Sequence, residues 1–250
     1  MNVGPLSGLR VVVTRPRAQA ASLITALESA GAVAVAVPVI AIDDPVDGGA
    51  ALQAAVEALS QGDWLVLTSP NGADRVGRVL TGSQLSSGVR VAAVGPATAA
   101  MAERAGIRVD LQPERSIAEG LLEVFPSAPA GGAHVVLARA EVARDVLPAG
   151  LEAAGWSVRD VAAYRTVAVP VDRAGREACA HADAVAFTSS STVTHLVDEV
   201  GVSGLPPVVV SIGPATSATC VERGVDVTVE AQAHTIPGMI AAFASWVSSR

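Results

Sequence analysis

Four short strings of small polar residues in this chain can bind an anion, and they form two matching pairs. Thr68-Ser69-Pro70-Asn71-Gly72 recurs 120 residues later as Thr188-Ser189-Ser190-Ser191-Thr192, and Gly95-Pro96-Ala97-Thr98 recurs 118 residues later as Gly213-Pro214-Ala215-Thr216. Each string lies between an apolar run and a helical stretch, where hydroxyls and free backbone N–H groups either cap the helix or bind an anion. Capping is the commoner use of any single residue. The matching positions favour two turns that contact one elongated ligand, and we expect Thr98 and Thr216 to face it.

Two arginines and the only tyrosine are the remaining candidates. Arg15 and Arg139 are 124 residues apart and are predicted to follow a strand directly in both copies. A planar guanidinium in that position suits a carboxylate or phosphate, although exposed arginines are usually solvated surface. Tyr164 stands near the end of a long predicted strand, where its phenol can donate a proton or a hydrogen bond. An ordinary half-buried tyrosine fits the composition equally well.

Several chemistries are excluded by what the chain lacks. All 17 basic residues are arginine, so no lysine can form a Schiff base or serve a P-loop. The four histidines and two cysteines have no ligand-like spacing, and we expect no metal site. Neither Gly-x-Ser-x-Gly nor Gly-x-Gly-x-x-Gly occurs, which leaves hydrolase and dinucleotide-binding functions without support. A net charge of −7 and few aromatic residues argue against a nucleic-acid surface.

The chain also lacks membrane and export signals. Val200–Val221 carries no charge, but several glycines and prolines interrupt it, which a membrane-spanning helix would not show. Residues 1–8 lack the basic and long apolar regions of a signal peptide, and we therefore predict a cytoplasmic protein.

Short Val-rich runs alternate with Ala-rich helical stretches along the whole chain, which predicts parallel sheets covered on both faces. A repeat near 120 residues is long enough for each copy to bury its own core. We expect an α/β protein with two flavodoxin-like, doubly wound domains and a ligand cleft between them. Gly31, Gly106, Gly155 and Gly224 mark helix ends. The predicted strands are Arg10–Thr14, Val33–Val37, Leu65–Thr68, Val89–Val94, Ile107–Leu111, His134–Ala138, Val158–Ala163, Ala184–Thr188, Val208–Ile212 and Val225–Val229.

The domain boundary does not follow the repeat. The two copies meet near Pro126–Gly132, but Val33–Ile42 and Val161–Val169 are predicted as unusually long strands that contain Pro38 or end before Pro170. Such strands can carry the chain from one domain to the other, as a two-segment linker.

From end to end the chain resembles the uroporphyrinogen-III synthase family. Each matching string is short and degenerate, but together they keep the order and the spacing of the family. They are Val13-Thr14-Arg15-Pro16, Ala30-Gly31, Thr68-Ser69-Pro70-Asn71-Gly72, Val94-Gly95-Pro96-Ala97-Thr98, Leu137-Ala138-Arg139, Tyr164-Arg165-Thr166, Phe187-Thr188-Ser189-Ser190, Ile212-Gly213-Pro214-Ala215-Thr216 and Thr235-Ile236-Pro237-Gly238-Met239.

The resemblance implies a discontinuous flavodoxin-like domain, residues 1–37 plus 170–250, and an inserted one, residues 41–165. It implies cofactor-free cyclisation of hydroxymethylbilane to uroporphyrinogen III, with loss of water and inversion of the last pyrrole ring through a spiro intermediate. Tyr164 matches the tyrosine position of the family and is the candidate proton donor. The candidate substrate-binding residues are Arg15, Thr68, Ser69, Asn71, Gly95, Thr98, Ser116, Arg139, Thr188, Ser189, Ser190, Gly213, Thr216 and Thr235.

The partner is then a linear tetrapyrrole, with no nucleic acid, membrane, metal or cofactor. We further expect a monomer that makes transient contact with the preceding enzyme of the pathway. The alternative is a two-lobed protein that binds or senses an anionic small molecule without catalysis. An electron carrier is weaker, because the phosphate-loop glycines and flanking aromatic residues of a flavin site are missing.

Overall fold

A computed structural model describes residues 4–130 and 132–250 of the chain. Residues 1–3, which belong to the N-terminal segment considered above, and residue 131, at the junction of the two copies, lie outside it. The chain divides into two compact units, which we call unit 1 (Met1–Ala41 with Val167–Arg250) and unit 2 (Ile42–Thr166). The division falls within two strands, β3 (Ile40–Asp43) and β7 (Ser157–Ala168), whereas the junction of the two copies lies inside unit 2.

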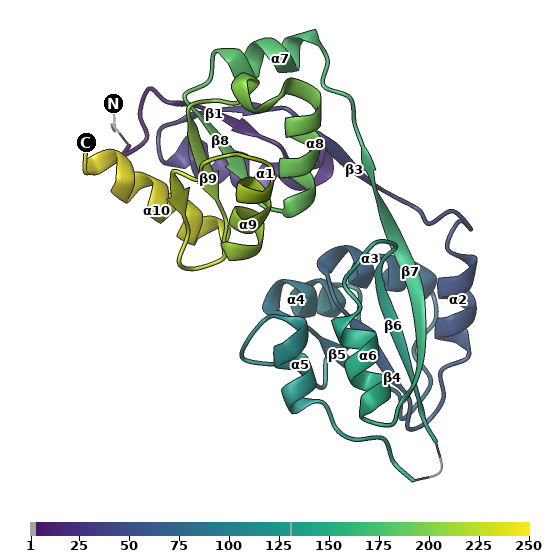
Figure 1. Cartoon of the computed structure of the whole chain (residues 1–250). Coiled ribbons are helices and arrows are strands. Elements are labelled where there is room, and N and C mark those ends of the chain that lie inside the picture. Colours follow the sequence, from purple (N-terminus) through teal and green to yellow (C-terminus); the bar gives the residue numbers. More distant parts are fainter. Residues whose placement is uncertain (1–3, 131) are drawn as a thin grey trace. The chain divides into compact units, whose positions relative to one another are not determined.

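Unit 1 contains a five-stranded sheet with helices on both faces (Figure 1). The strand order is β10-β9-β8-β1-β2, and every neighbouring pair is parallel. Helices α1 and α10 pack on one face, and α7, α8 and α9 on the other. The elements are β1 Arg10–Val13, α1 Arg17–Ser29, β2 Val33–Ala36, α7 Arg173–Ala180, β8 Ala184–Phe187, α8 Ser190–Val200, the 3-10 turn Val202–Gly204, β9 Val208–Ser211, α9 Pro214–Glu222, β10 Val229–Glu230 and α10 Ile236–Ser248.

Unit 2 also contains a five-stranded sheet, with the strand order β3-β7-β6-β4-β5, in which β7, β6, β4 and β5 run parallel to one another. Helices α2, α3 and α4 pack on one face of its sheet, and α5 and α6 on the other. The remaining elements are α2 Ala50–Glu57, β4 Trp64–Leu67, α3 Pro70–Val79, β5 Arg90–Ala93, α4 Pro96–Arg104, α5 Ala118–Val124, β6 His134–Ala140 and α6 Val146–Ala153. The mixed α/β architecture with parallel sheets confirms this part of the predicted fold class.

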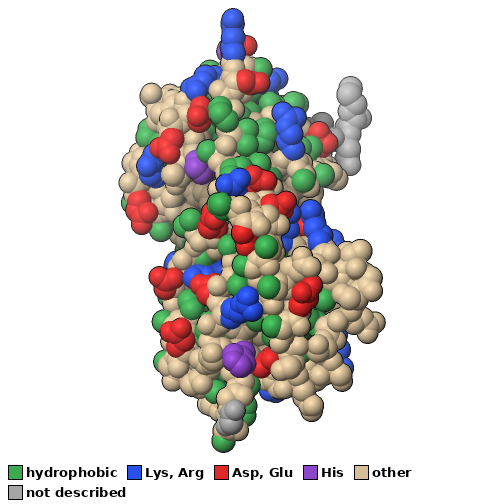
Figure 2. All heavy atoms as spheres, turned by 90° about the vertical axis from the view of Figure 1, so that its right-hand side faces the viewer, with side chains coloured by type: hydrophobic (Ala, Val, Ile, Leu, Met, Phe, Trp, Pro, Cys, Tyr) green, Lys and Arg blue, Asp and Glu red, His purple; other side chains and the backbone are tan. Residues whose placement is uncertain are grey.

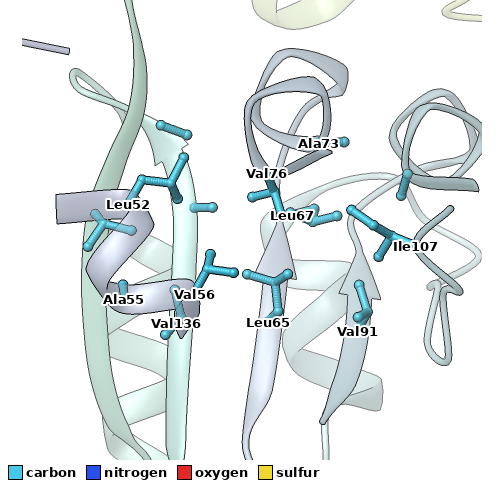
Figure 3. Close-up of a cluster of buried hydrophobic side chains, with 14 of the residues drawn as sticks. Leu52, Ala55, Val56, Leu65, Leu67, Ala73, Val76, Val91, Ile107 and Val136 are labelled. Atoms are coloured by element: carbon cyan, nitrogen blue, oxygen red, sulfur yellow. The ribbon is translucent and has the colours of Figure 1, made fainter. Parts of the chain in front are cut away.

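Aliphatic side chains fill the core of unit 2. Leu65 and Leu67 of β4 point between Val56 of α2 and Val76 of α3, and all four are at most 4% exposed (Figure 3). The opposite face of β4 carries Trp64 and Val66, which pack with residues of α5 and α6. Because β4 is buried on both faces, every residue of the strand is apolar, as expected for a central strand of a parallel sheet.

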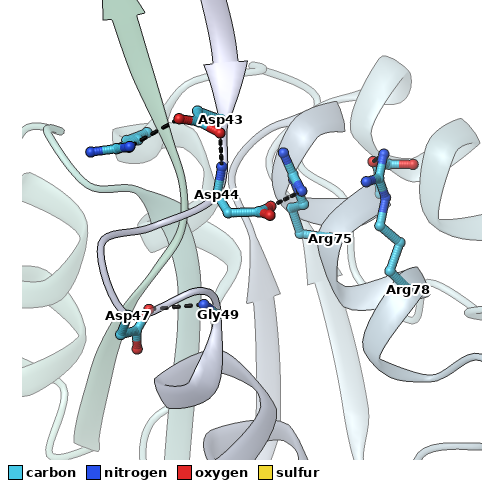
Figure 4. Close-up of polar contacts among 8 residues, drawn as sticks. Asp43, Asp44, Asp47, Gly49, Arg75 and Arg78 are labelled. Carbon is cyan, nitrogen blue, oxygen red and sulfur yellow. Dashed lines mark hydrogen bonds and ion pairs between the residues drawn. The ribbon is translucent and has the colours of Figure 1, made fainter.

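Charged side chains connect the end of β3 and the segment that follows it to the rest of unit 2 (Figure 4). Asp43 accepts a hydrogen bond from Arg165 of β7 at 2.9 Å, and the adjacent Asp44 pairs with Arg75 of α3. Hydrogen bonds from Arg165 and from the Asp44 backbone N–H hold the pKa of Asp43 below its usual value. Asp47 then accepts backbone N–H bonds at the start of α2.

Arginine and acidic side chains are interspersed on the face drawn in Figure 2. Several arginines of the chain form ion pairs within a helix, such as Arg78 with Asp74 and Arg173 with Glu177, and others pair between elements, such as Arg176 with Glu199. Arginines paired in this way have less charge available for an anionic ligand than unpaired ones. Within the described residues, no helix combines the length and apolarity needed to cross a bilayer.

Five predicted strands differ from the structure. Val33–Ile42 is wrong as one strand, because Pro38, which has no backbone N–H, separates β2 from β3. Val158–Ala163 and Val161–Val169 instead form the single strand β7. Ile107–Leu111 is reduced to one bridge between Leu111 and Ala92, and Val225–Val229 to the two-residue β10.

The last two strands are short for the same reason. Asp110 accepts a hydrogen bond from the backbone N–H of Val91 at 2.9 Å, and the corresponding Thr228 accepts one from Val209 at 3.1 Å. A side-chain oxygen thus takes the place of a backbone partner in both units. The predicted helix ends are confirmed, since Gly31, Gly106, Gly155 and Gly224 all have positive φ, between 72° and 93°.

In each unit an aspartate side chain connects the two central strands through hydrogen bonds. Asp63, just before β4, accepts hydrogen bonds from the backbone N–H of His134 at 2.8 Å and from the N–H and hydroxyl of Ser60 at 2.9 Å. Asp183, just before β8, accepts one from the backbone N–H of Arg10 at 2.7 Å. Burial opposes ionisation of Asp63, but these hydrogen bonds outweigh it and hold its pKa below the ordinary value.

We predict that Asp63→Asn lowers the free energy of unfolding of unit 2 by about 2 kcal/mol, because hydrogen bonds to a charged acceptor contribute about 1.5–3 kcal/mol. Urea unfolding followed by tryptophan fluorescence measures this loss, since Trp64 is buried next to Asp63. A depressed carboxyl pKa stabilises the fold above the ordinary value of about 3.9, and this contribution disappears as the pH falls through the folded-state pKa. The difference between wild type and variant should therefore shrink below about pH 4.

The control is Asp74→Asn on the exposed side of α3, which removes only an i,i+4 pair with Arg78. Such a pair contributes less than about 0.5 kcal/mol. Equal losses in the two variants would contradict the role assigned to Asp63.

Candidate functional site

Ser69 links the start of α3 to the sheet at the carboxyl edge of unit 2. It is the N-cap of α3, and its Oγ accepts a hydrogen bond from the Gly72 backbone N–H at 3.1 Å. The same hydroxyl donates to the Tyr164 Oη, also at 3.1 Å. A Cβ on Gly72 would lie only 3.0 Å from the Ala138 carbonyl oxygen, so glycine lets α3 approach β6 this closely. Capping by Ser69 is confirmed, and the contact with Tyr164 adds a second use.

A β-bulge orients Tyr164 toward Ser69. In the pairing of β6 with β7, Arg139 lies opposite Ala162 but Ala140 lies opposite Tyr164, so Ala163 is the extra residue. Side chains normally alternate along a strand, yet Ala163 and Tyr164 both pack in the core below α3. Bulges re-aim side chains in this way and are common next to active sites. Tyr164 is 8% exposed.

A pocket of about 250 Å³ opens at the same edge of unit 2. It gathers three of the predicted site residues, Thr68, Ser116 and Arg139, together with Arg144. A Cβ on Gly95 would lie 3.0 Å from the Ser116 side chain, so this glycine is required for Ser116 to pack against the start of α4. Arg144 was not among the predicted site residues.

The predicted position of Arg139 after a strand is wrong, because Arg139 lies within β6. Its Nε donates to both carboxylate oxygens of Asp160 on β7, at 2.8 and 2.9 Å. Its terminal nitrogens donate to the Arg144 carbonyl oxygen at 2.7 Å and to Asp145 at 3.2 Å. Hydrogen bonding to Asp160, despite partial burial, raises the pKa of Arg139. The positive charge of Arg139 is thus already used inside unit 2.

The corresponding edge of unit 1 carries Thr188, Ser189 and Ser190, all half-buried, after β8. Ser189 is the N-cap residue of α8 but makes no side-chain cap bond, unlike Ser69. The Ser190 Oγ donates to the Ala215 carbonyl oxygen at 3.1 Å and accepts from the Thr219 hydroxyl at 2.8 Å. Ser190 therefore joins α8 to α9, where the other copy has Pro70.

A loop before α10 completes this edge of unit 1. Thr235 caps α10, accepting a hydrogen bond from Gly238 N–H at 3.1 Å. The preceding His234 lies against Gly213, where a Cβ would come within 2.7 Å of the imidazole. His234 is 118 residues after Ser116, which packs on Gly95 in the same way. The repeat offset was the signal that could have pointed to His234.

Two predicted contacts are wrong in their orientation. Thr98 and Thr216, expected to face a ligand, are each only 4% exposed in the first turns of α4 and α9. Both threonines are among the buried residues of their helices and do not lie on the exposed face. Asn71 lies half-buried in the first turn of α3.

Arg15 is the candidate cation of unit 1. It follows β1 after one residue, is half-buried, and makes no hydrogen bond or ion pair with residues 4–130 or 132–250. Burial lowers its pKa, because the charged guanidinium is partly removed from water. A half-buried guanidinium without a partner is suited to an anionic ligand.

No metal site or reactive thiol occurs in the part of the chain that the structure describes. No group of three or more histidine, cysteine or acidic residues is arranged to hold a metal ion there. Cys179 and Cys220 are free and buried in unit 1, and burial raises the pKa of Cys220 to about 11. A buried thiol with such a pKa is inert as a nucleophile.

Comparisons with known proteins point to one family. The model of the family described as "Uroporphyrinogen-III synthase HemD" matches residues 21–241. A uroporphyrinogen-III synthase from Synechococcus elongatus is 33% identical over 97% of both chains, and a putative one from Methanothermobacter thermautotrophicus is 31% identical over 94% of this chain and 97% of that one.

Solved structures share the fold. A mutant uroporphyrinogen III synthase from Thermus thermophilus superposes with a TM-score of 0.67 at 19% identity, covering 97% of this chain and 100% of that one. A uroporphyrinogen-III synthetase from Helicobacter pylori gives a TM-score of 0.64 at 13% identity, covering 95% and 99%.

We predict that Ser69→Ala lowers the free energy of unfolding by about 1 kcal/mol, the usual cost of a lost N-cap. The matched control is Ser189→Ala, which removes the equivalent serine where no side-chain cap bond exists. Urea unfolding should show a clearly smaller loss for this control. A loss at Ser189 as large as that at Ser69 would contradict the difference between the two caps.

Proposed function

We propose catalytic and binding roles for the residues above on the premise that the chain belongs to the uroporphyrinogen-III synthase family. Its function is the cyclisation of hydroxymethylbilane to uroporphyrinogen III, with loss of water and inversion of the last pyrrole ring. The observation that carries the roles is the hydrogen bond between Ser69 and Tyr164 at the carboxyl edge of a parallel sheet, which is where ligands bind in open α/β folds.

Tyr164 is the proton donor in this proposal. The Gly72 N–H donates to Ser69, and Ser69 donates to Tyr164, so the hydrogen of the Tyr164 hydroxyl stays available for a third group. Successive hydrogen bonds of this kind polarise one another. Tyr164 donates this proton to the substrate hydroxyl as the C–O bond breaks, and water leaves. The proton released when the ring closes returns to the tyrosinate.

Apart from proton transfer, the protein acts mainly by orienting the substrate. The linear substrate closes by itself to the uninverted isomer, so the protein must hold a flexible polycarboxylate in the geometry that leads to inversion. Neutral donors at the carboxyl edges of both sheets, such as Thr68, Ser116, Thr188 and Thr235, supply hydrogen bonds without a strong local charge. Helix N-termini add a partial positive potential. These groups disturb a developing azafulvenium cation less than a lysine would.

Arg15 is the proposed carboxylate ligand of unit 1. The remaining members of the proposed binding set are Ser69, Asn71, Gly95, Thr98, Ser189, Ser190, Gly213 and Thr216, whereas Arg139, whose charge is paired inside unit 2, contributes by holding its neighbours in place. For the buried Thr98 and Thr216 the contribution is through the backbone of their helix turns, and for Gly95 and Gly213 it is the close approach of the neighbouring loop.

The finer architecture belongs to the same proposal. We assign two flavodoxin-like domains, residues 1–37 plus 170–250 and residues 41–165, on the strand orders in the two sheets. We further propose a cytoplasmic monomer that needs no cofactor, does not bind nucleic acid, and receives its short-lived substrate through transient contact with the preceding enzyme. Family membership over nearly the whole chain favours catalysis over a binding protein without chemistry.

Isomer analysis tests the function directly. Freshly made hydroxymethylbilane is incubated with and without the protein, the products are oxidised, and type I and type III uroporphyrin are separated. Type III above the spontaneous type I background is the expected result. Type I alone, from folded protein, would overturn the function and leave the non-catalytic alternative.

We predict that Tyr164→Phe lowers kcat by about 10²-fold, the low end of the range for general acid catalysis, while its thermal unfolding stays close to that of wild type. Ser69→Ala keeps the phenol and should reduce kcat by less than about tenfold. Steady-state formation of type III isomer measures both effects. A Tyr164→Phe variant with kcat within twofold of wild type would remove Tyr164 as the acid.

The variant Arg15→Gln tests whether Arg15 contributes to substrate binding or to the stability of the fold. Removing a half-buried cation that has no partner in the described structure should leave the melting temperature of the free protein equal or higher, because its desolvation cost disappears. The same change should raise KM by about tenfold through loss of a charge-assisted contact. A lowered melting temperature with unchanged KM would instead assign Arg15 to the fold.

A further inference from the structure

We propose that Arg144, and not Arg139, is the cation that binds a substrate carboxylate in the pocket of unit 2, and that Arg139 is the residue that positions it. This inference rests on the proposed function, which supplies a polycarboxylate substrate. It concerns the pocket lined by Thr68, Ser116, Arg139, Arg144 and Leu147, whose residues all belong to unit 2.

The positive charge of Arg139 is already paired with acidic residues of unit 2. All three of its nitrogens already donate hydrogen bonds, to Asp160, Asp145 and the carbonyl oxygen of Arg144. Its side chain is only 11% exposed, and it is paired with the carboxylates of two aspartates. A substrate carboxylate beside it would meet those negative charges as well, which offsets the attraction.

Arg144 is in the opposite situation. Its side chain is 70% exposed, and the one ion pair that it makes within residues 4–130 and 132–250, with Glu119, is long at 3.4 Å. Such an exposed pair contributes little to stability, so the guanidinium can exchange Glu119 for a ligand at small cost. A substrate carboxylate can then be bound by two parallel N–H···O bonds, the geometry for which arginine is best suited.

The bond from Arg139 explains how an exposed arginine is kept at the pocket. Arg139 donates to the Arg144 carbonyl oxygen at 2.7 Å, a charge-assisted bond that fixes the backbone of the loop between β6 and α6. Asp160 orients Arg139 from the neighbouring strand β7. Asp160 thus orients Arg139, and Arg139 in turn holds the backbone of Arg144, whose exposed guanidinium has only the long contact with Glu119.

The size and lining of the pocket indicate what Arg144 binds. At about 250 Å³ it is smaller than the roughly 300–1,000 Å³ of sites that enclose a whole drug-sized ligand. It suits one carboxylate side chain of the tetrapyrrole, with its methylene groups against Leu147 and its oxygens toward Arg144, Ser116 and Thr68. Arg144 thus contributes to substrate binding and not to proton transfer.

Steady-state kinetics with hydroxymethylbilane test this role. Arg144→Gln should raise KM by about fivefold to tenfold and leave kcat within twofold, because the lost contact is made equally in the ground and transition states. Arg144→Lys keeps the charge without the planar fork and should give an intermediate KM. The KM difference between wild type and Arg144→Gln should shrink in 0.5 M salt, about the level at which exposed charges are strongly screened.

The matched control is Arg108→Gln. Arg108 is also an exposed arginine of unit 2 with one long acidic contact, to Asp110 at 3.5 Å, but it does not line the pocket. Its KM should equal that of wild type. Arg139→Gln should raise KM and also lower the melting temperature, because it removes the bonds to Asp160 as well as the support of Arg144.

Two outcomes overturn the inference while leaving the synthase function intact. They are an Arg144→Gln variant whose KM matches that of Arg108→Gln, and a loss confined to kcat. A wild-type protein that yields no type III isomer would overturn the proposed function itself, which is a separate result. Fluorescence titration with uroporphyrin III, a stable tetrapyrrole with the same carboxylates, gives a second readout, and Arg144→Gln should weaken its binding by a similar factor.

Discussion

The parallel pairing of two central strands in each unit determines where everything else lies. β1 pairs with β8 and β4 with β6, and each pair is fixed at its amino end by an aspartate that accepts the backbone N–H of the neighbouring strand. Parallel strands bring their carboxyl ends to one edge, and the helix that follows each strand begins there. The same pairing that buries the apolar residues of β4 on both faces therefore gathers Thr68, Ser69 and Arg139 at one edge.

Much of this arrangement could be predicted from the sequence because the chain repeats itself. A recurring string identifies equivalent turns without any knowledge of the fold, and the strands, the helix stops at Gly31 and Gly106, and the cap at Ser69 all follow from local rules. The activity was predicted from the resemblance to the family and not from these local rules. The strand ends were less accessible, since Asp110 and Thr228 shorten their strands through hydrogen bonds to residues 19 positions away in sequence.

Which arginines are paired with acidic side chains could not be predicted from the sequence. Arg15 and Arg139 hold equivalent places in the repeat, yet one is unpaired among the described residues and the other is saturated by Asp160. Asp160 is 21 residues from Arg139, and only the register of β6 with β7 brings them together. The bulge at Ala163 is equally invisible to a pattern of alternating residues, although it decides which face Tyr164 occupies. For Arg139 and Tyr164, long-range register and not residue type therefore decides what the side chain contacts.

The two copies use equivalent serines differently. In unit 2, Ser69 uses its hydroxyl to cap α3 and to orient Tyr164, whereas the equivalent Ser189 of unit 1 makes no cap bond and is followed by Ser190, which joins α8 to α9. A substrate whose four rings are similar must nevertheless be distinguished end from end, because only the last ring is inverted. Two identical edges would bind either orientation equally. In the roles proposed above, the edge of unit 2 supplies a phenol as acid and the edge of unit 1 an arginine unpaired among the described residues, and this asymmetry would provide the difference in binding free energy that selects a single orientation.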